Sequence, residues 1–297
     1  MKAMILINFV DRAHITPPVL AAVEDVLREA RVEFSTVRFT SRRHSEEAIS
    51  EAAEKGFDTI FLGGGDGGVH NLFNIAFHRN FTFGILPLGT VNALARSLGL
   101  PHDPVEAVRA ALGGRPCSLD VGRAAGRWFN CFLSIGFDAS VVCTLDEKTK
   151  VRWGRAAFAV QGLKRLACMK ELPRFAARFF PSGFEAQGQS LLVSNIANYA
   201  GFRLFPGQMN DGIMDSVLFT RNGPLPLFAG IGGMFCSRKK TASATGSIIR
   251  EPLRRVDVRS TAPLFVQMDG DAVILPAPAQ ELSVEVHPGA ARFLAPR

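Results

Sequence analysis

The chain has 297 residues, which is enough for one large domain or two domains of ordinary size. Hydrophobic residues make up 47% of the sequence and charged residues 21%, so a sizeable core can form. The formal net charge of +7 suits a nucleic acid, an anionic membrane surface or an anionic substrate as partner.

The cysteines and the apolar runs argue against secretion and against a membrane span. Five cysteines are scattered without a C-x-x-C pair, which excludes an obvious disulfide framework or zinc site and fits a reducing compartment. The apolar stretch of residues 1–8 is too short for a signal peptide. The weakly polar run 224–236 is broken by prolines and glycines and is too short to cross a bilayer. We therefore expect a cytoplasmic protein.

The first part of the chain alternates between strand and helix patterns. Such alternation predicts an α/β domain with a parallel sheet covered on both faces. Ser45, followed by Glu46 and Glu47, is expected to cap the second helix, and the Asp103-Pro104-Val105-Glu106 box to open the last. The expected strands are 3–8, 34–39, 59–62 and 81–86, and the expected helices are 17–30, 45–55, 69–76, 90–99 and 104–112.

The pattern changes near Asp120, where short strand-like runs begin to dominate. One basic helical stretch, about 153–170, interrupts them. We expect a nucleotide-binding domain over 1–122 and a mainly antiparallel, β-rich domain over 123–284, with a final strand at about 285–297 that can return to the first domain. The expected strands of this part are 128–135, 190–194, 214–219, 256–260, 264–268 and 282–286.

A glycine-rich turn at 63–68 follows the apolar run 59–62 and precedes a helix. Glycines let the backbone approach a ligand closely, and the amides of the following helix can bind an anion. With Asp66 at its centre, the turn predicts a phosphate site with a built-in carboxylate. It is not a Walker A loop, because no Gly-Lys-Ser or Gly-Lys-Thr follows, and a simple tight connection is the alternative.

A second turn, at 87–92, also joins an apolar strand to a helix. Two such turns at the ends of successive parallel strands lie side by side, at the edge where open α/β sheets bind ligands. The hydroxyl of Thr90 and the amide of Asn92 are candidates for contacts with phosphate or ribose oxygens. A plain helix N-cap is the alternative role for Thr90.

These motifs together resemble the diacylglycerol kinase catalytic family, which includes sphingosine, ceramide and bacterial diacylglycerol kinase-like lipid kinases. The family is related in fold to NAD kinase and phosphofructokinase, so the resemblance implies a two-domain fold of that kind. The matching segments are Asn8, Thr40 with His44, Gly-Gly-Asp-Gly at 64–67, Pro-Leu-Gly-Thr-Val-Asn at 87–92, Asp120, Gly-Phe-Asp-Ala at 136–139, the run 205–215 and Met-Asp-Gly-Asp at 268–271.

The resemblance implies an ATP-dependent lipid kinase that uses Mg²⁺ and transfers the γ-phosphoryl group to a lipid hydroxyl, with diacylglycerol as the default acceptor. A sphingoid base or ceramide is an alternative acceptor. A kinase of a soluble acceptor is another alternative, through the shared Gly-Gly-Asp-Gly turn. The implied nucleotide-binding residues are Asn8, Thr40, Gly64, Gly65, Asp66, Gly67, Gly68, Gly89, Thr90 and Asn92.

Phosphoryl transfer needs bound phosphates, a metal held by oxygen ligands and a carboxylate near the attacking hydroxyl. We expect Asp66 to hold the catalytic magnesium through water. Asp269 or Asp271 is expected to accept the substrate proton, with Asp271 preferred from its family position, and Asp120 adds a further carboxylate. The alternative for Asp-Gly-Asp at 269–271 is an ordinary hairpin turn. His44, His70 and Asp138 are interpreted as structural residues.

Some positions depart from the family pattern. Asp211 and Asp215 are the candidate ligands of a structural metal, but Asn210 replaces one carboxylate there. Gly68 replaces a threonine, and His70 and Asn71 replace an asparagine and a glutamate. These changes keep open a second hypothesis, a catalytically degenerate lipid- or nucleotide-binding protein.

Basic residues interleave with apolar ones between 144 and 178. This pattern suits an anionic membrane surface, and a solvated helix face is the alternative. We expect peripheral membrane association and no nucleic-acid partner, and a homodimer is an option. The basic residues are Lys148, Lys150, Arg152, Arg155, Lys164, Arg165, Lys170, Arg174 and Arg178, with a second group at Arg238, Lys239, Lys240, Arg250, Arg254 and Arg255.

Overall fold

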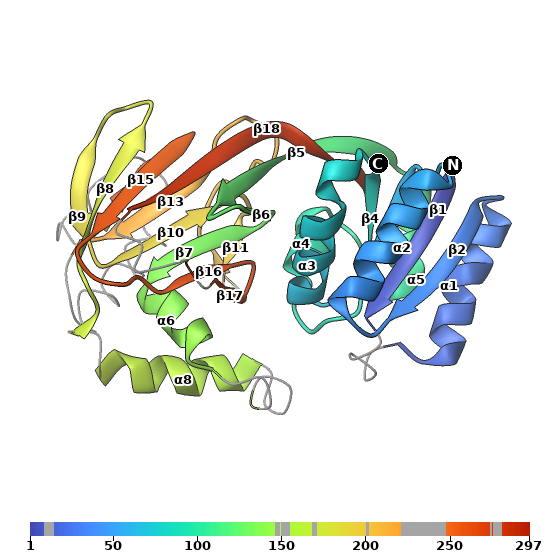
Figure 1. Cartoon of the computed structure of the whole chain (residues 1–297), viewed down its shortest axis with the longest axis horizontal. Coiled ribbons are helices and arrows are strands. Elements are labelled where there is room, and N and C mark those ends of the chain that lie inside the picture. The colour runs from blue at the N-terminus through green and yellow to red at the C-terminus, as the bar shows by residue number, and fades with distance from the viewer. Residues whose placement is uncertain are drawn as a thin grey trace. The chain divides into compact units, whose positions relative to one another are not determined.

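The computed structural model describes residues 1–8, 15–145, 149, 155–167, 171–199, 202–220, 248–273, 275 and 281–297 (Figure 1). These residues form two compact units. The first comprises Met1–Leu119 and Gly289–Arg297, and the second comprises Asp120–Pro288. No helix in the described part of the chain is long and apolar enough to span a bilayer.

The first unit contains the predicted parallel sheet. Its strands are β1 (Lys2–Asn8), β2 (Glu33–Phe39), β3 (Thr59–Gly64) and β4 (Thr82–Pro87), in the order β2-β1-β3-β4. All neighbouring pairs are parallel. The end of the chain adds a strand, because Arg292 and Phe293 of β18 (Glu281–Ala295) pair in parallel with β4. Every residue of β3 is buried, as expected for a strand covered on both faces.

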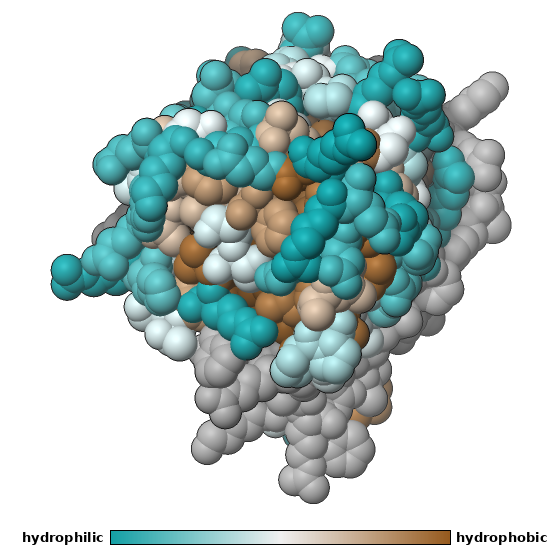
Figure 2. Space-filling model, turned by 90° about the vertical axis from the view of Figure 1, so that its right-hand side faces the viewer, coloured by the Kyte–Doolittle hydropathy of each residue, from teal (hydrophilic) through white to brown (hydrophobic). Residues whose placement is uncertain are grey.

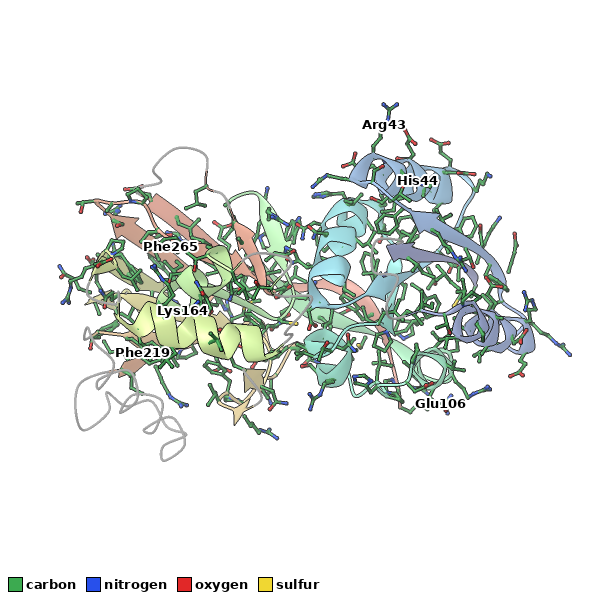
Figure 3. All side chains as sticks on the ribbon, turned by 90° about the horizontal axis from the view of Figure 1, so that it is seen from below. Arg43, His44, Glu106, Lys164, Phe219 and Phe265 are labelled. Atoms are coloured by element: carbon green, nitrogen blue, oxygen red, sulfur yellow. The ribbon has the colours of Figure 1, made fainter. Side chains whose placement is uncertain are left out.

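Helices cover this sheet on both faces. In Figure 3, Arg43 and His44 on α2 and Glu106 on α5 lie on opposite sides of it. Figure 2 looks onto the first unit from the side of β2 and α1, and hydrophilic side chains frame the hydrophobic ones near the centre of this face. The helices are α1 (Pro17–Glu29), α2 (Arg42–Glu54), α3 (Asp66–Ala76), the 3₁₀ helix η1 (Phe77–Arg79), α4 (Ala93–Ser97) and α5 (Pro104–Leu112).

Of the five predicted helix starts, two are confirmed and three are wrong. Helix α1 begins at Pro17 as predicted, and α3 begins at Asp66 rather than at Val69. Helix α2 begins one turn before Ser45, because Ser41 is its N-cap and accepts a hydrogen bond from the amide of His44. Helix α4 begins at Ala93 rather than near Thr90. Helix α5 begins as predicted, with Asp103 accepting from the amides of Val105 and Glu106.

The second unit is rich in antiparallel strands, as predicted. One sheet has the order β14-β13-β10-β7-β16-β17. A further set pairs β18 with β15, β15 with β8 and β8 with β9, all antiparallel. The bounds are β7 (Phe132–Gly136), β8 (Phe175–Phe180), β9 (Glu185–Gly188), β10 (Ser190–Ser194), β13 (Asp215–Phe219), β14 (Ile248–Arg250), β15 (Arg255–Ser260), β16 (Val266–Met268) and β17 (Asp271–Val273).

Several smaller elements of the second unit were not predicted. They include α6, which follows β7 directly. The strand β5 was not predicted either; it begins in the first unit, and its end pairs with β6 in the second. The helix predicted at 153–170 is confirmed over the described residues of that range, where it is α8. The bounds are β5 (Arg115–Ala124), β6 (Arg127–Phe129), α6 (Phe137–Cys143), α8 (Arg155–Ala167), β11 (Asn198–Tyr199) and β12 (Phe202–Arg203).

The core of the second unit consists of side chains from the inner faces of its strands. In β15, exposed and half-buried residues alternate with the buried Val256, Val258 and Ser260, which is the period of a strand with one face inward. Phe129, Phe179 and Leu133 of the same core are fully buried. This packing gives the turns between the strands fixed positions.

Candidate functional site

The nucleotide-binding residues predicted in the first unit gather at the carboxyl edge of its parallel sheet. Asn8, the last residue of β1, pairs with Phe39, and the exposed Thr40 follows directly. Gly64 at the end of β3 pairs with Pro87 at the end of β4. The carboxyl ends of the neighbouring strands β2, β1, β3 and β4 therefore lie along one edge of the sheet. Open α/β sheets bind ligands at this edge.

The two glycine turns are in direct backbone contact. The amide of Leu88 donates to the carbonyl of Gly64 at 3.0 Å. A Cβ atom at Gly89 would lie 2.5 Å from the Cα atom of Gly65, and one at Gly65 would lie 3.2 Å from the Cα atom of Gly89. Position 89 therefore requires glycine for this approach, and a side chain at position 65 would be tight, so the sequence brings the two turns together by omitting side chains.

Asp66 ties the first turn to the second. Its Oδ1 atom accepts a hydrogen bond of 2.5 Å from the amide of Ala93, the first residue of α4. The carboxylate is half-buried and belongs to the first turn of α3. The positive end of the α3 dipole stabilises a carboxylate at this position. The Asp66 carboxylate also stays partly exposed beside the glycines.

Asn92 has a closing role within its own turn. Its Oδ1 atom accepts from the amide of Gly89 at 2.9 Å, and its Nδ2 atom donates to the carbonyl of Gly89 at 2.8 Å. The residue is 4% exposed and has a φ of +50°. Asn92 also directly precedes α4, so the N-cap role considered for Thr90 is wrong, and Thr90 is exposed.

The start of α3 provides the anion-binding end of a helix. Its first three residues are Asp66, Gly67 and Gly68, and the amides of a first helical turn have no acceptor within the helix. Gly68 brings no hydroxyl to this turn. His70 is 1% exposed, and Asn74 donates to its carbonyl, which agrees with a structural interpretation of this histidine.

In the second unit, β16 and β17 form a hairpin around Asp269 and Gly270. Their φ angles are +49° and +89°, and Met268 pairs with Asp271 across the turn. Positive φ at both central residues is the requirement of a type I′ turn, and the Asp-Gly dipeptide favours it. The hairpin interpretation of this motif is therefore confirmed, and it is compatible with a catalytic role.

The two carboxylates of the hairpin have different surroundings. Asp269 is 4% exposed and accepts hydrogen bonds of 2.8 to 2.9 Å from the amides of Asn130, Cys131 and Phe132. Asp271 begins β17 and is half-buried. Asp269 thus anchors the hairpin to the β6–β7 connection, and Asp271 is the carboxylate with access to solvent.

Asp120 is also a buried anchor. It is 1% exposed, its Oδ2 atom accepts from the amide of Gly212 at 2.7 Å, and its own amide donates to the carbonyl of Met209 at 2.7 Å. Asn195 donates to the carbonyl of Asp120 at 2.8 Å. These bonds hold the loop that carries Asp211.

Asp215 lies near Asp211 and Arg250. Burial raises the pKa of Asp215, and the charge of Asp211 raises it further, against opposing effects of the Gly207 amide and of Arg250. Two carboxylates with a guanidinium beside them are a poor donor set for a divalent cation. No cluster of three or more His, Cys, Asp and Glu side chains that could hold a metal occurs in the described residues. A structural metal at Asp211 and Asp215 stays a prediction that this geometry does not favour.

Magnesium that binds together with ATP needs fewer protein ligands than a structural metal. Mg²⁺ often binds through one or two carboxylates together with waters and substrate phosphates. Asp66, half-buried next to the amides of α3, fits that requirement. The sequence offers no second carboxylate in either glycine turn.

Three polar residues behind the hairpin were not predicted as part of the site. Ser134 on β7, Asp138 on α6 and Gln267 on β16 are joined by hydrogen bonds. Asp138 belongs to the Gly-Phe-Asp-Ala segment, but the sequence indicated only a turn residue. Ser134 is four residues away, but Gln267 is 129 residues away, so the sequence could not show the complete cluster.

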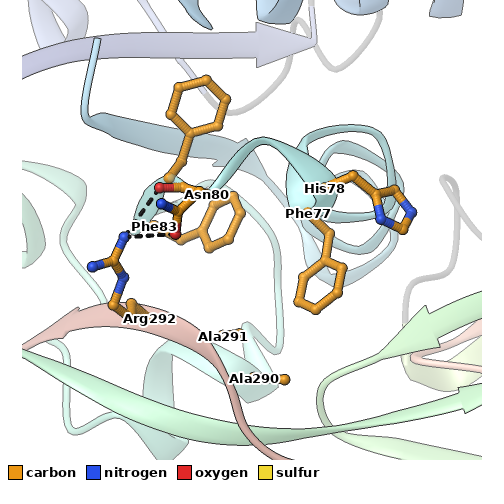
Figure 4. A pocket seen from close by; sticks show the side chains of 8 residues that line it. Phe77, His78, Asn80, Phe83, Ala290, Ala291 and Arg292 are labelled. Carbon is orange, nitrogen blue, oxygen red and sulfur yellow. Dashed lines mark hydrogen bonds between the residues drawn. The ribbon is translucent and has the colours of Figure 1, made fainter. Parts of the chain in front are cut away.

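A separate hollow of about 270 Å³ lies at the other edge of the first unit's sheet, near the start of β4. Arg292 donates to the backbone and side-chain oxygens of Asn80 at its rim (Figure 4). This hollow is distinct from the glycine turns, which follow the carboxyl ends of β3 and β4. Its lining residues are Phe77, His78, Asn80, Phe81, Phe83, Ala290, Ala291 and Arg292.

Comparison with known proteins agrees with this geometry. Residues 2–124 match the family described as the diacylglycerol kinase catalytic domain. The first unit is therefore similar to a diacylglycerol kinase catalytic domain. The predicted resemblance to this family of lipid kinases is thereby confirmed.

Relatives and solved structures extend the similarity along the chain. A protein named "Probable lipid kinase YegS-like" from Citrobacter koseri is 26% identical over 283 residues, covering 91% of this chain and 89% of the relative. One of the same name from Enterobacter sp. is 29% identical over 225 residues, covering 69% and 73%. The crystal structure of a diacylglycerol kinase from Bacillus anthracis has a TM-score of 0.68 at 18% identity, covering 99% of this chain and 96% of that chain. A second crystal structure from that organism gives 0.74 at 19% identity, with the same coverage. The predicted two-domain fold is therefore confirmed.

Proposed function

We propose that this lipid kinase transfers the γ-phosphoryl group of ATP, bound with Mg²⁺, to the hydroxyl of a lipid, with diacylglycerol as the first acceptor to test. The observation that carries the proposal is the contact of the two glycine turns, which Asp66 joins by its bond to the amide of Ala93 while Asn92 closes the second turn. Phosphoryl transfer depends mainly on positioning and on neutralising charge, and a rigid cradle of backbone amides meets the first requirement.

Each group of the cradle has a role in this proposal. The amides of Gly67 and Gly68 at the start of α3 bind phosphate oxygens, and the exposed Thr90 hydroxyl donates to the nucleotide. Asp66 would hold the magnesium ion, which would neutralise phosphate charge. Asn8 and Thr40, at the neighbouring strand ends, contact the rest of the nucleotide.

Asp271 is the proposed general base. Asp269 is nearly inaccessible, and three backbone amides occupy its carboxylate, so removal of a proton from a lipid hydroxyl by Asp269 would disrupt its hairpin. Asp271 stands two residues further and is partly exposed. It accepts the hydroxyl proton as the lipid oxygen attacks the γ-phosphorus atom, while the bond from that atom to the bridging oxygen breaks and ADP leaves.

The outer face of α8 is the proposed membrane contact. Val160 and Leu163 are 55% and 72% exposed, and Lys164 is exposed beside them (Figure 3). The inner face is anchored, since Arg165 donates to Ser140 at 3.2 Å and Gln161 donates to Thr144 at 2.8 Å. The described helix contains basic residues and no acidic ones, as expected for a helix at an anionic bilayer surface. Lys148, Lys150, Arg152, Lys170, Arg238, Lys239 and Lys240 lie outside the described residues.

The direct test is incubation of the protein with radiolabelled ATP, Mg²⁺ and vesicles that contain diacylglycerol, monoacylglycerol, ceramide and a sphingoid base in separate reactions. We expect label in the lipid fraction, with the product identified by mass, and none with an Asp66→Ala variant. Absence of a labelled lipid in all four reactions would reject the proposal. Label that remains only in the aqueous phase would indicate a soluble acceptor.

A further inference from the structure

A buried polar cluster lies directly behind the Asp-Gly-Asp hairpin of the second unit. Ser134 on β7 and Gln267 on β16 are fully buried and are direct cross-strand partners. Asp138, in the first turn of α6, lies beside both. Asp138 is half-buried. Burial of polar side chains is costly unless each finds hydrogen-bond partners, so their arrangement requires an explanation.

The cluster is connected to the hairpin turn by one side chain. The Oε1 atom of Gln267 accepts from the amide of Gly270 at 2.9 Å. Its Nε2 atom donates to Ser134 Oγ at 2.9 Å and to Asp138 Oδ2 at 3.2 Å. The hydroxyl of Ser134 donates to the same carboxylate oxygen. Gly270 is the residue between the anchor Asp269 and the proposed base Asp271.

The carboxylate of Asp138 determines which way this chain of hydrogen bonds runs. An ionised carboxylate only accepts, so the amide of Gln267 must turn its NH₂ group toward Asp138. The carbonyl oxygen of Gln267 is then directed at the amide of Gly270. A side chain at 138 that could also donate would allow the amide to turn over and would leave Gly270 without its acceptor.

Tyr199 completes the cluster from β11. Its hydroxyl is hydrogen-bonded to Asp138, and its ring packs edge-on against Phe132 with centroids 5.0 Å apart. Burial, together with the charge of Asp138, raises the pKa of Tyr199 well above its usual value. The hydroxyl therefore keeps its proton and acts as a further donor to the carboxylate.

We propose that Gln267, oriented by Asp138, is a positioning residue that fixes the Asp269-Gly270 turn and thereby holds the carboxylate of Asp271 in place for proton acceptance. This inference rests on the proposed function of Asp271 as the base. Two independent anchors then hold the turn. Asp269 is bound to the amides of 130–132, and Gly270 is bound to Gln267. A base must lie within hydrogen-bond reach of the proton it removes, so small displacements of the turn matter.

The kinetic test uses Gln267→Met, which keeps the length of the side chain and removes its amide. We expect kcat to fall by about 10- to 100-fold while the KM for ATP stays within about twofold, because only the position of the base changes. Gln187→Met, at an exposed site on β9, is the matched control and leaves kcat unchanged. Asp138→Asn is a second variant, and it should also lower kcat, because an asparagine at this position can donate and allows the amide of Gln267 to turn over.

A double-mutant comparison separates positioning from general damage to the fold. In an Asp271→Asn background, Gln267→Met should lower the residual kcat by less than about threefold, because the residue acts through a base that is already absent. A full multiplicative loss would show that Gln267 acts elsewhere and would overturn the inference.

Hydrogen–deuterium exchange tests the turn without any substrate. We expect amides within 266–273 to exchange at least about tenfold faster in Gln267→Met than in the wild type, and Gln187→Met to match the wild type. An unchanged exchange rate, or an unchanged kcat, overturns the inference. If kcat falls in Asp271→Asn but not in Gln267→Met, the inference about Gln267 is overturned and the proposed base is retained. Wild-type kcat in Asp271→Asn overturns the proposed base, and the inference falls with it.

Discussion

The glycine turns of the first unit and the Asp-Gly-Asp hairpin of the second unit both place carboxylates at tight turns, but different atoms hold them. Backbone contact holds the glycine turns, and an added Cβ atom at Gly89 would lie 2.5 Å from the Cα atom of Gly65. Side chains hold the hairpin, through the carboxylate of Asp269 and the amide of Gln267. Substitutions that add a side chain should therefore disrupt the glycine turns, and substitutions that remove a polar side chain should disrupt the hairpin.

A similar contrast distinguishes the two aspartates of the hairpin, one proposed as the base and the other as an anchor of the turn. Asp269 and Asp271 are two residues apart, yet one is nearly inaccessible and the other is half-buried. We therefore expect loss of the Asp271 carboxylate to change the rate and loss of the Asp269 carboxylate to change the stability.

The largest effect is expected from Asp271→Asn. Removal of a general base lowers kcat by about 10²- to 10⁴-fold, whereas the KM for ATP and the melting temperature should change little. Steady-state kinetics with vesicles and a thermal melt would measure both. A kcat within threefold of the wild type would contradict the proposed role.

Asp269→Ala is the contrasting variant. It leaves the buried amides of Asn130, Cys131 and Phe132 without their carboxylate partner, at a cost of about 1–3 kcal/mol for an unsatisfied group. We expect a lower free energy of unfolding as its first effect, visible in a denaturant titration. Full stability with abolished turnover would exchange the roles of the two aspartates.

Gly89→Ala should break the contact between the glycine turns. Overpacking of this kind costs about 1–3 kcal/mol, so kcat/KM for ATP should fall by about tenfold or more. The matched control is Gly113→Ala, whose Cβ atom would lie 3.5 Å from the carbonyl oxygen of Arg109, an ordinary contact. Equal activities of the two variants would show that the turns tolerate separation.

The glycine turns could be predicted from the sequence because their signals are local. An apolar run followed by glycines ends a buried strand, and parallel strands place their carboxyl ends at one edge. The Asp103 box likewise contains its whole cap within four residues. The start of α2 was misplaced because Ser41 and Ser45 are one turn apart, and each can cap a helix.

The hairpin network could not be predicted, because its partners meet only after the strands pair. Asp269 is bound to amides more than 130 residues earlier, and Gln267 meets Ser134 across β16 and β7. The short motif Asp-Gly-Asp therefore indicated a turn and a carboxylate pair, but it could not show which carboxylate supports the turn. Strand register supplies that distinction.

A smaller effect is expected at the outer face of α8. Lys164→Glu replaces an attractive charge by a repulsive one, and each basic residue near an anionic bilayer contributes about 1 kcal/mol. Binding to phosphatidylserine vesicles should weaken by about 5- to 30-fold in a flotation assay, with no change on neutral vesicles. Arg259→Glu, an exposed cation on β15, is the control. Equal loss in both variants would indicate a general charge effect rather than a docking face.

The smallest effect is expected at Asp103→Ala, at the start of α5. The side chain caps α5 by accepting from two amides, and loss of an N-cap costs about 1 kcal/mol. The melting temperature should fall by about 2–4 °C in Asp103→Ala. In Asp103→Asn, which retains an acceptor oxygen, the melting temperature should fall by less. Because α5 packs behind the sheet on β4 and α1, kcat should stay unchanged. A loss of kcat in Asp103→Ala would mean that the catalytic domain transmits strain from its helices to the glycine turns, and the cradle would then depend on more than its own backbone contacts.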